Sequence, residues 1–172
     1  MSAAPAWPTA DQRRALLRHP AGWVGTGFGS GLSPLAPGTA GSLAALLPWL
    51  ALRELPPPGY ALALVAAFAL GVWACGWIVA ALRIADPGVA VWDEFVGLWI
   101  ALAPLLPRPA AWPWIGAGFV LFRLFDIFKP WPVSWADRRV GGGLGVMLDD
   151  VIAGAYAAIV LTLLMLWLPG VE

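Results

Sequence analysis

The chain has 172 residues, of which 60% are hydrophobic and only 12% are charged, and its mean hydropathy is +0.78. A soluble domain carries about twice this charged fraction because its surface faces water, so the composition predicts a membrane protein. The net charge of zero supplies no basic field, which argues against nucleic-acid binding.

The N-terminal segment, residues 1–20, is polar and rich in proline and alanine. Arg13, Arg14 and Arg18 are spaced for one side of a short helix, so we expect either an interfacial helix or a flexible tail. The single histidine, His19, is expected on the surface without a partner. A signal-peptide pattern is absent from this segment, so internal segments are expected to drive membrane insertion.

A loop rich in glycine and hydroxyl side chains follows, GTGFGSGLSPLAPGTAGS, from Gly25 to Ser42. Backbone amides in such a loop, leading into a helix with Thr39 as its N-cap, would form a cradle for an anion. Small residues could equally serve close helix packing. The loop lacks Gly-Lys-Ser/Thr and is therefore not a Walker A loop.

Five apolar segments occupy residues 39–52, 60–82, 94–107, 112–125 and 150–168, separated by prolines and polar residues. Only the second and fifth approach the ~20 residues that a full membrane crossing needs. We therefore predict an all-α integral membrane protein with one domain over residues 1–172. Its architecture would be a compact bundle of about five short transmembrane or re-entrant helices, preceded by the interfacial segment.

Small residues at Gly71, Cys75 and Gly76 offer a surface where helices could meet, which leaves homo-oligomerisation open. Cys75 is the single cysteine, so an intrachain disulfide is excluded, and we expect it to pack as a small hydrophobe.

Charge is distributed unevenly if all five segments cross. Of the ten basic residues, all but Arg53 and Arg108 fall on the N-terminal side, which the positive-inside rule predicts to be cytoplasmic. Of the ten acids, all but Glu54 and Glu172 fall on that same side. Because acids do not follow the insertion rule, their gathering there needs another explanation.

Carboxylates occur in three groups at predicted helix ends: Asp93 with Glu94, Asp126, and Asp149 with Asp150. Helix capping would explain one acid at each N-terminus, and neighbouring cations would explain the acid at 126. Capping does not explain two helices with two acids each, and doubled acids near lipid are costly unless compensated. Oxygen ligands in this number suit Mg²⁺, so we predict that they hold a metal ion.

Cations are interleaved with these acids in FRLFDIFKPWPVSWADRRVGGGLGVMLDD, residues 122–150. Arg123, Lys129, Arg138 and Arg139 would clamp phosphate oxygens, although attraction to anionic lipid is an alternative role. The residues that two other kinds of hydrolase would need are absent from the sequence. The isolated histidine disfavours a histidine nucleophile, and the chain contains no Gly-x-Ser-x-Gly elbow.

Four motifs occur in order and together cover residues from about 22 to 165: TGFGSGLSPLAPGTAGS, VWDEFVG, FRLFDIFKPWP and GGLGVMLDD. This combination resembles the bacterial phosphatidylglycerophosphatase A family. The resemblance implies a Mg²⁺-dependent phosphatase of the inner membrane, active in phospholipid biosynthesis. Its substrate would be phosphatidylglycerol phosphate, which loses its terminal phosphate to give phosphatidylglycerol and inorganic phosphate.

The positions that match the family motifs imply a polar core of Thr39, Asp93, Glu94, Asp126, Lys129, Asp137, Asp149 and Asp150. The predicted catalytic residues are Asp93, Glu94, Asp126, Asp149 and Asp150, and the predicted metal ligands are Glu94, Asp126, Asp149 and Asp150. The predicted phosphate-binding residues are Ser30, Gly38, Thr39, Arg123, Lys129 and Arg138. Asp93 or Asp150 would accept a proton from the attacking water. The number of metal ions and the existence of an aspartyl-phosphate intermediate are left open.

One departure from the family concerns the glycines at 141–143. Family members often carry His-Gly-Gly where this chain has Gly141, Gly142 and Gly143. Any catalytic role of that histidine is therefore missing here or is taken by another residue.

A rival function from another class is an acid-lined ion or proton transporter, which would use the same carboxylates as a conduction path. Against it, the acids gather on one face rather than along the whole bilayer. A non-catalytic membrane scaffold would leave the doubled acids without a purpose.

Overall fold

The computed structural model describes residues 7–106 and 112–168, and every regular element in this part of the chain is a helix. The elements are α1 (Ala10–Arg18), α2 (Pro20–Gly25), η1 (Ser30–Leu32), α3 (Pro37–Leu52), α4 (Pro57–Leu82), α5 (Trp92–Leu102), η2 (Ala103–Leu105), α6 (Trp112–Phe128), α7 (Val133–Arg139) and α8 (Gly142–Trp167). The predicted all-α class is thus confirmed for the described residues. Arg108, Glu172 and the predicted turn at 107–109 lie outside them.

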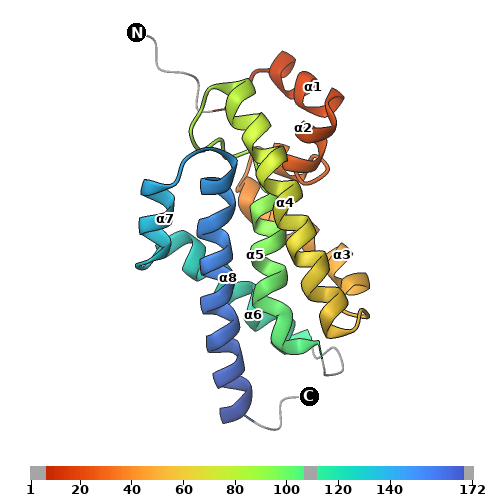
Figure 1. The fold of residues 1–172 in the computed structure, drawn as a ribbon, viewed down its shortest axis with the longest axis vertical. Coiled ribbons are helices and arrows are strands. Elements are labelled where there is room, and N and C mark those ends of the chain that lie inside the picture. The colour runs from red at the N-terminus through yellow and green to blue at the C-terminus, as the bar shows by residue number, and fades with distance from the viewer. Residues whose placement is uncertain (1–6, 107–111, 169–172) are drawn as a thin grey trace.

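Each of the five predicted apolar segments corresponds to one long helix, namely α3, α4, α5, α6 and α8. Within the described residues, α4 and α8, of 26 residues each, are the two helices long and apolar enough to cross a membrane. Successive long helices run in alternating directions along the bundle (Figure 1). This alternation agrees with the sides assumed for the charge count, whereas a crossing by each shorter helix stays a prediction.

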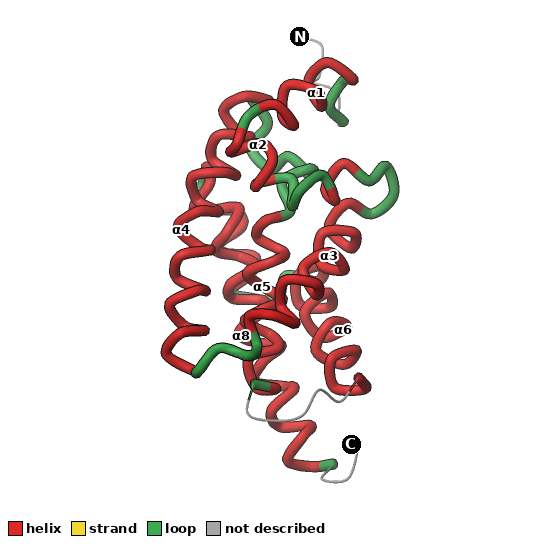
Figure 2. Tube along the Cα trace, turned by 90° about the vertical axis from the view of Figure 1, so that its right-hand side faces the viewer, coloured by secondary structure: helices red, strands yellow, loops and turns green. Residues whose placement is uncertain are grey.

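Helices α5 and α8 form the centre of the bundle, with α4 on one side and α6 on the other (Figure 2). Glycine lets their backbones touch, because a Cβ on Gly154 would lie 2.3 Å from the carbonyl oxygen of Gly97. At the upper end of α8, a Cβ on Gly143 would lie 2.0 Å from the carbonyl oxygen of Val72 in α4. Two glycine contacts therefore fix α8 against its neighbours.

The small-residue surface predicted on α4 serves packing inside the chain. Cys75 is fully buried, as expected, and a Cβ on Gly71 would lie 2.4 Å from the sulfur of Met147 in α8. A Cβ on Gly76 would reach Gly143 at 3.5 Å. Homo-oligomerisation stays a prediction that this surface does not support.

Three buried hydrogen bonds connect α3, α4 and α5. Trp92 and Trp99 of α5 donate their indole N–H groups to the carbonyls of Ala67 and Ala45, both at 2.9 Å. The Tyr60 hydroxyl of α4 donates to the carbonyl of Trp99 at 2.6 Å. Since each indole and phenol end has a partner, these large side chains can be buried without loss of a hydrogen bond.

The N-terminal segment folds as a helical corner against α4. A capping box between Thr9 and Gln12 starts α1. His19 stacks on Trp77 with the ring centroids 4.0 Å apart, and its Nδ1 accepts the N–H of Ala21 at 3.2 Å. The prediction of a partnerless surface histidine was wrong, because sequence spacing does not show that this corner packs on α4. Its interfacial position stays a prediction.

Two predicted helix starts also differ from the structure. Helix α3 begins at Pro37 after Ala36, which has φ of 46°, so Thr39 is the third helical residue and not the N-cap. Helix α8 begins at Gly142, which places Asp149 and Asp150 about two turns inside it. Capping therefore does not explain these two acids, because the glycines at 141–143 already open the helix.

Candidate active site

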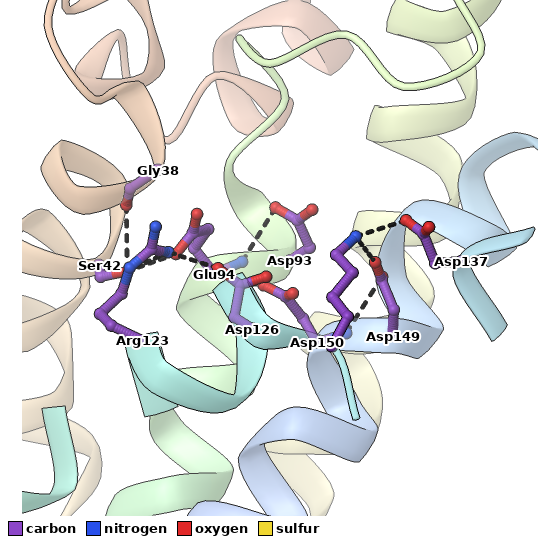
Figure 3. Close-up of polar contacts among 10 residues, drawn as sticks. Gly38, Ser42, Asp93, Glu94, Arg123, Asp126, Asp137, Asp149 and Asp150 are labelled. Atoms are coloured by element: carbon purple, nitrogen blue, oxygen red, sulfur yellow. Dashed lines mark hydrogen bonds and ion pairs between the residues drawn. The ribbon is translucent and has the colours of Figure 1, made fainter. Parts of the chain in front are cut away.

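Carboxylates from three helices converge at one level of the bundle (Figure 3). Asp93 and Glu94 lie in the first turn of α5, Asp126 lies near the end of α6, and Asp149 and Asp150 lie in α8. Asp150 is close enough to the other four that each repels its negative charge. The five predicted catalytic residues are thus brought together.

The glycine contact between α5 and α8 positions these acids. Gly97 follows Asp93 by four residues, and Gly154 follows Asp150 by four, so each glycine lies about one turn from its acid on the same helix face. The backbone contact at the two glycines therefore holds the first turn of α5 beside the acidic part of α8.

One cation joins α3, α5 and α6 in what we term the Arg123 cluster: Ser42, Glu94, Arg123 and Asp126. Arg123 donates to Glu94 and to Asp126 Oδ2, the latter at 2.9 Å. The Ser42 hydroxyl donates to Glu94, which is only 7% exposed. A Cβ on Gly38 would lie 2.1 Å from Glu94 Oε1, so this glycine leaves room for the buried pair. The ion pair between Arg123 and Asp126 shows that the alternative explanation of this acid, a neighbouring cation, also holds.

A second cation joins the end of α6 to α7 and α8 in the Lys129 cluster: Lys129, Asp137 and Asp149. Lys129 Nζ donates to Asp137 and to Asp149 Oδ2, the latter at 2.8 Å. Burial alone would lower the pKa of Lys129, but the hydrogen bonds to the two carboxylates outweigh it and raise that pKa. The amine therefore stays charged. Lys129, although near Asp126 in the sequence, pairs with these two acids because the chain turns back through α7.

Asp150 lies between the two clusters and differs from their acids. It is 3% exposed, and its Oδ2 is buried without a hydrogen-bond partner among the described residues. A buried carboxylate oxygen in this state is costly unless a cation or donor binds it. Asp150 is therefore the place in the site where a ligand is most needed.

Charge and ligand type fit Mg²⁺, although no coordination shell is already formed. Six carboxylates, counting Asp137, face two cations, so the site carries excess negative charge that a divalent ion would offset. In the part of the chain that the structure describes, no three His, Cys, Asp or Glu side chains are grouped closely enough to hold a metal. Four of these carboxylates are instead paired with Arg123 or Lys129.

Three predicted phosphate-binding residues have other contacts or positions. The Ser30 hydroxyl donates to the carbonyl of Gly27 at 2.8 Å and thereby holds the glycine-rich loop. Arg138 is exposed on α7, where its Nε donates to the carbonyl of Ser134 at 2.9 Å. Thr39 is half-buried in the first turn of α3.

Comparison with known proteins identifies the family. Residues 23–165 match the family model described as Phosphatidylglycerophosphatase A. The chain belongs to the phosphatidylglycerophosphatase A family. It is 44% identical over 145 residues to the Phosphatidylglycerophosphatase A of Escherichia coli, covering 84% of this chain and 83% of the relative. It is 41% identical over 157 residues to that of Haemophilus influenzae, covering 91% and 95%.

A third relative carries a different name. It is a Putative phosphatidylinositol-3-phosphatase of Bacteroides thetaiotaomicron, 46% identical over 144 residues, covering 80% of this chain and 89% of the relative. No solved structure matches the chain. The predicted family and enzyme class are confirmed: this family member is a phosphatase. The transporter alternative finds no support.

Sequence reasoning missed the packing roles of Gly97 and Gly154, whereas close packing was one of the two roles given for the loop that contains Gly38. Gly38 was expected to bind phosphate through its amide, but its visible role is to let Glu94 and Arg123 pack on α3. Gly97 stands inside the quoted VWDEFVG motif, and Gly154 follows Asp150 by four residues, a spacing that could have indicated a shared helix face. At Gly141, where the family resemblance led us to expect histidine, an added Cβ would meet nothing within 4 Å. The missing side chain thus leaves open space.

Proposed function

We propose that this phosphatase removes the terminal phosphate of phosphatidylglycerol phosphate, giving phosphatidylglycerol and inorganic phosphate in phospholipid biosynthesis. Two relatives bear the corresponding name. The observation that carries the proposal is the convergence of carboxylates from α5, α6 and α8 around Arg123 and Lys129. Such a site can bind a phosphate monoester and a divalent ion side by side.

The proposed location is the bacterial inner membrane, with several crossings and the site at the cytoplasmic face. Support comes from the length and hydropathy of α4 and α8 and from apolar side chains that point outward, such as Leu62 and Trp167, 70% and 86% exposed. The excess of basic residues on the N-terminal side favours a cytoplasmic position for that end.

Glu94, Asp126, Asp149 and Asp150 are the proposed ligands of one or two Mg²⁺ ions. When bound, Mg²⁺ neutralises phosphate oxygens and makes water more acidic. In this proposal the carboxylates of the two clusters exchange their cation partners for the ion. Their ligand type supports this assignment, and the unpartnered Asp150 Oδ2 supports it further.

The chain's own groups would bind the phosphoryl group and move the proton. Arg123 and Lys129 would donate to phosphoryl oxygens and offset the charge that develops in the transition state. Asp93 or Asp150 would accept the proton of the attacking water. Water forms the new bond to phosphorus, the bond from phosphorus to the glycerol oxygen breaks, and that oxygen leaves with a proton.

The test is phosphate release by the purified protein in detergent, with Mg²⁺ and with excess EDTA. We expect release from phosphatidylglycerol phosphate that EDTA stops, and a fall in kcat of at least about 100-fold in Asp126→Asn. Asp11→Asn, an exposed acid on α1, is the matched control and should keep wild-type activity.

Two results would count against the proposal. Phosphate release that persists in EDTA would show that no metal ion is required. Faster hydrolysis of phosphatidylinositol 3-phosphate, assayed as a comparison substrate, would overturn the assigned lipid. Full activity of Asp126→Asn would remove that residue from the ligand set.

A further inference from the structure

An apolar groove runs between α3 and α4 on the outside of the bundle. Its volume is about 650 Å³, within the range of about 300 to 1,000 Å³ typical of ligand sites. Its wall and floor include Ala51 and Leu52 of α3, Ala63 and Ala66 of α4, and Trp92 and Trp99 of α5.

The polar ends of the floor residues are directed into the protein. The indole N–H groups of Trp92 and Trp99 are bound to the carbonyls of Ala67 and Ala45. Tyr60 in turn holds the backbone carbonyl of Trp99. The indoles are thus fixed in place and offer the groove only their apolar surface, so the ligand that suits it is a hydrocarbon chain.

The groove and the candidate active site share two helices, α3 and α5. Trp92 on its floor directly precedes Asp93 in the first turn of α5. On α3, Pro48 at the groove follows Ser42 of the Arg123 cluster by six residues, or about 9 Å of helix. A lipid whose phosphate lies at the carboxylates would therefore have a chain within reach of the groove.

Alanines give the groove its depth. Ala63, Ala66 and Ala67 recur at helical spacing on one face of α4, and from Ala63 to Leu70 this face covers about 10 Å. We infer that the groove binds one acyl chain of the phospholipid substrate and positions its headgroup at the acids. This inference rests on the proposed function, because it takes the substrate to be a membrane lipid.

The test fills the groove with Ala66→Phe. Ala66 is exposed, so the larger side chain should enter the groove without disturbing buried packing. Ala61→Phe is the matched control, since Ala61 is also exposed and lies about 140° around α4 from Ala66. Both variants are assayed on phosphatidylglycerol phosphate with long chains and on its dihexanoyl analogue.

We expect kcat/KM of Ala66→Phe to fall about tenfold for the long-chain substrate, mainly through KM, which corresponds to about two displaced methylene groups. Ala66→Phe should hydrolyse the dihexanoyl analogue with the kcat/KM of the wild type. Ala61→Phe should have the wild-type kcat/KM for both substrates. Ala63→Leu, a smaller filling, should show the same selectivity to a lesser degree.

If the ratio of kcat/KM for the two substrates is the same in Ala66→Phe and Ala63→Leu as in the wild type, the acyl-chain site is overturned. The groove would then contact only ordinary bilayer lipid. Equal loss on both substrates would overturn the acyl-chain site as well. If the wild type releases no phosphate from either lipid, the proposed function itself fails, and this inference fails with it.

Discussion

The two ion-pair clusters of the site have the same arrangement of charges and different surroundings. Each places one cation between two carboxylates, but the Arg123 and Glu94 side chains are 15% and 10% exposed, whereas Lys129 and Asp137 are 28% and 32% exposed. The Arg123 cluster connects three long helices, while the Lys129 cluster depends on the short α7. The buried cluster thus also holds the helices together, and the open cluster can exchange partners with a ligand more readily.

The nature of the cation strengthens this contrast. Arginine presents several donors in a fixed plane, which suits a buried contact to two acids and a hydroxyl. Lysine carries a point charge on a flexible stem and can follow a phosphate group as it reacts. Removing Arg123 should therefore affect stability most, and removing Lys129 should affect catalysis most.

Arg123→Ala has the largest expected effect. It leaves Glu94 buried without its charge partner, and we predict a loss of about 3–5 kcal/mol of stability together with loss of activity. Thermal unfolding in detergent micelles measures the stability, with exposed Arg14→Ala as the control. Wild-type stability in Arg123→Ala would contradict the structural role of the buried cluster.

Lys129→Met should cost less stability than Arg123→Ala, because the Lys129–Asp137 pair is partly exposed, although Asp149, 7% exposed, loses its charge partner. Phosphate release should nevertheless fall about 100-fold, as when one donor to a developing anion is lost. Steady-state kinetics and unfolding are measured on the same preparation, with Arg139→Met as the control in α7. A large loss of stability with little loss of kcat would reverse the contrast drawn between the clusters.

Gly38→Ala should have a smaller effect on the Arg123 cluster. The new Cβ would lie 2.1 Å from Glu94 Oε1, so the carboxylate or α3 must shift by a fraction of an ångström or more. We predict a fall in kcat of about tenfold, since small misplacements in an active site are costly. Gly116→Ala, whose Cβ would meet nothing within 4 Å, is the control. Equal activity of the two variants would show that Glu94 tolerates displacement.

The sequence predicted the helices better than their ends. Apolar segments bounded by prolines gave the five long helices, because hydropathy and helix length are local properties. The start of α8 was misplaced because the apolar segment was taken to begin at residue 150, although the helix already begins at Gly142. Thr39 was assigned as a cap for a similar reason, since the left-handed Ala36 has no sequence signature.

The convergence of the five acids was predictable, but their pairings with cations were not. The four motifs pointed to the acids that converge around Asp150, and an excess of carboxylates on one side was visible from counting. Which cation meets which acid depends on the fold of α7, which brings Asp137 to Lys129. The place of His19 against Trp77 likewise depends on tertiary contact that spacing does not encode.

The central claim is that the converged carboxylates bind a divalent ion through Asp150. The most direct measurement is electron paramagnetic resonance of Mn²⁺ binding to the purified protein, with Mn²⁺ standing in for Mg²⁺. We expect binding that Mg²⁺ displaces, an affinity at least about tenfold weaker in Asp150→Asn, and wild-type affinity in Asp11→Asn. Equal Mn²⁺ affinity in the wild type and Asp150→Asn, or no binding by the wild type, would contradict it.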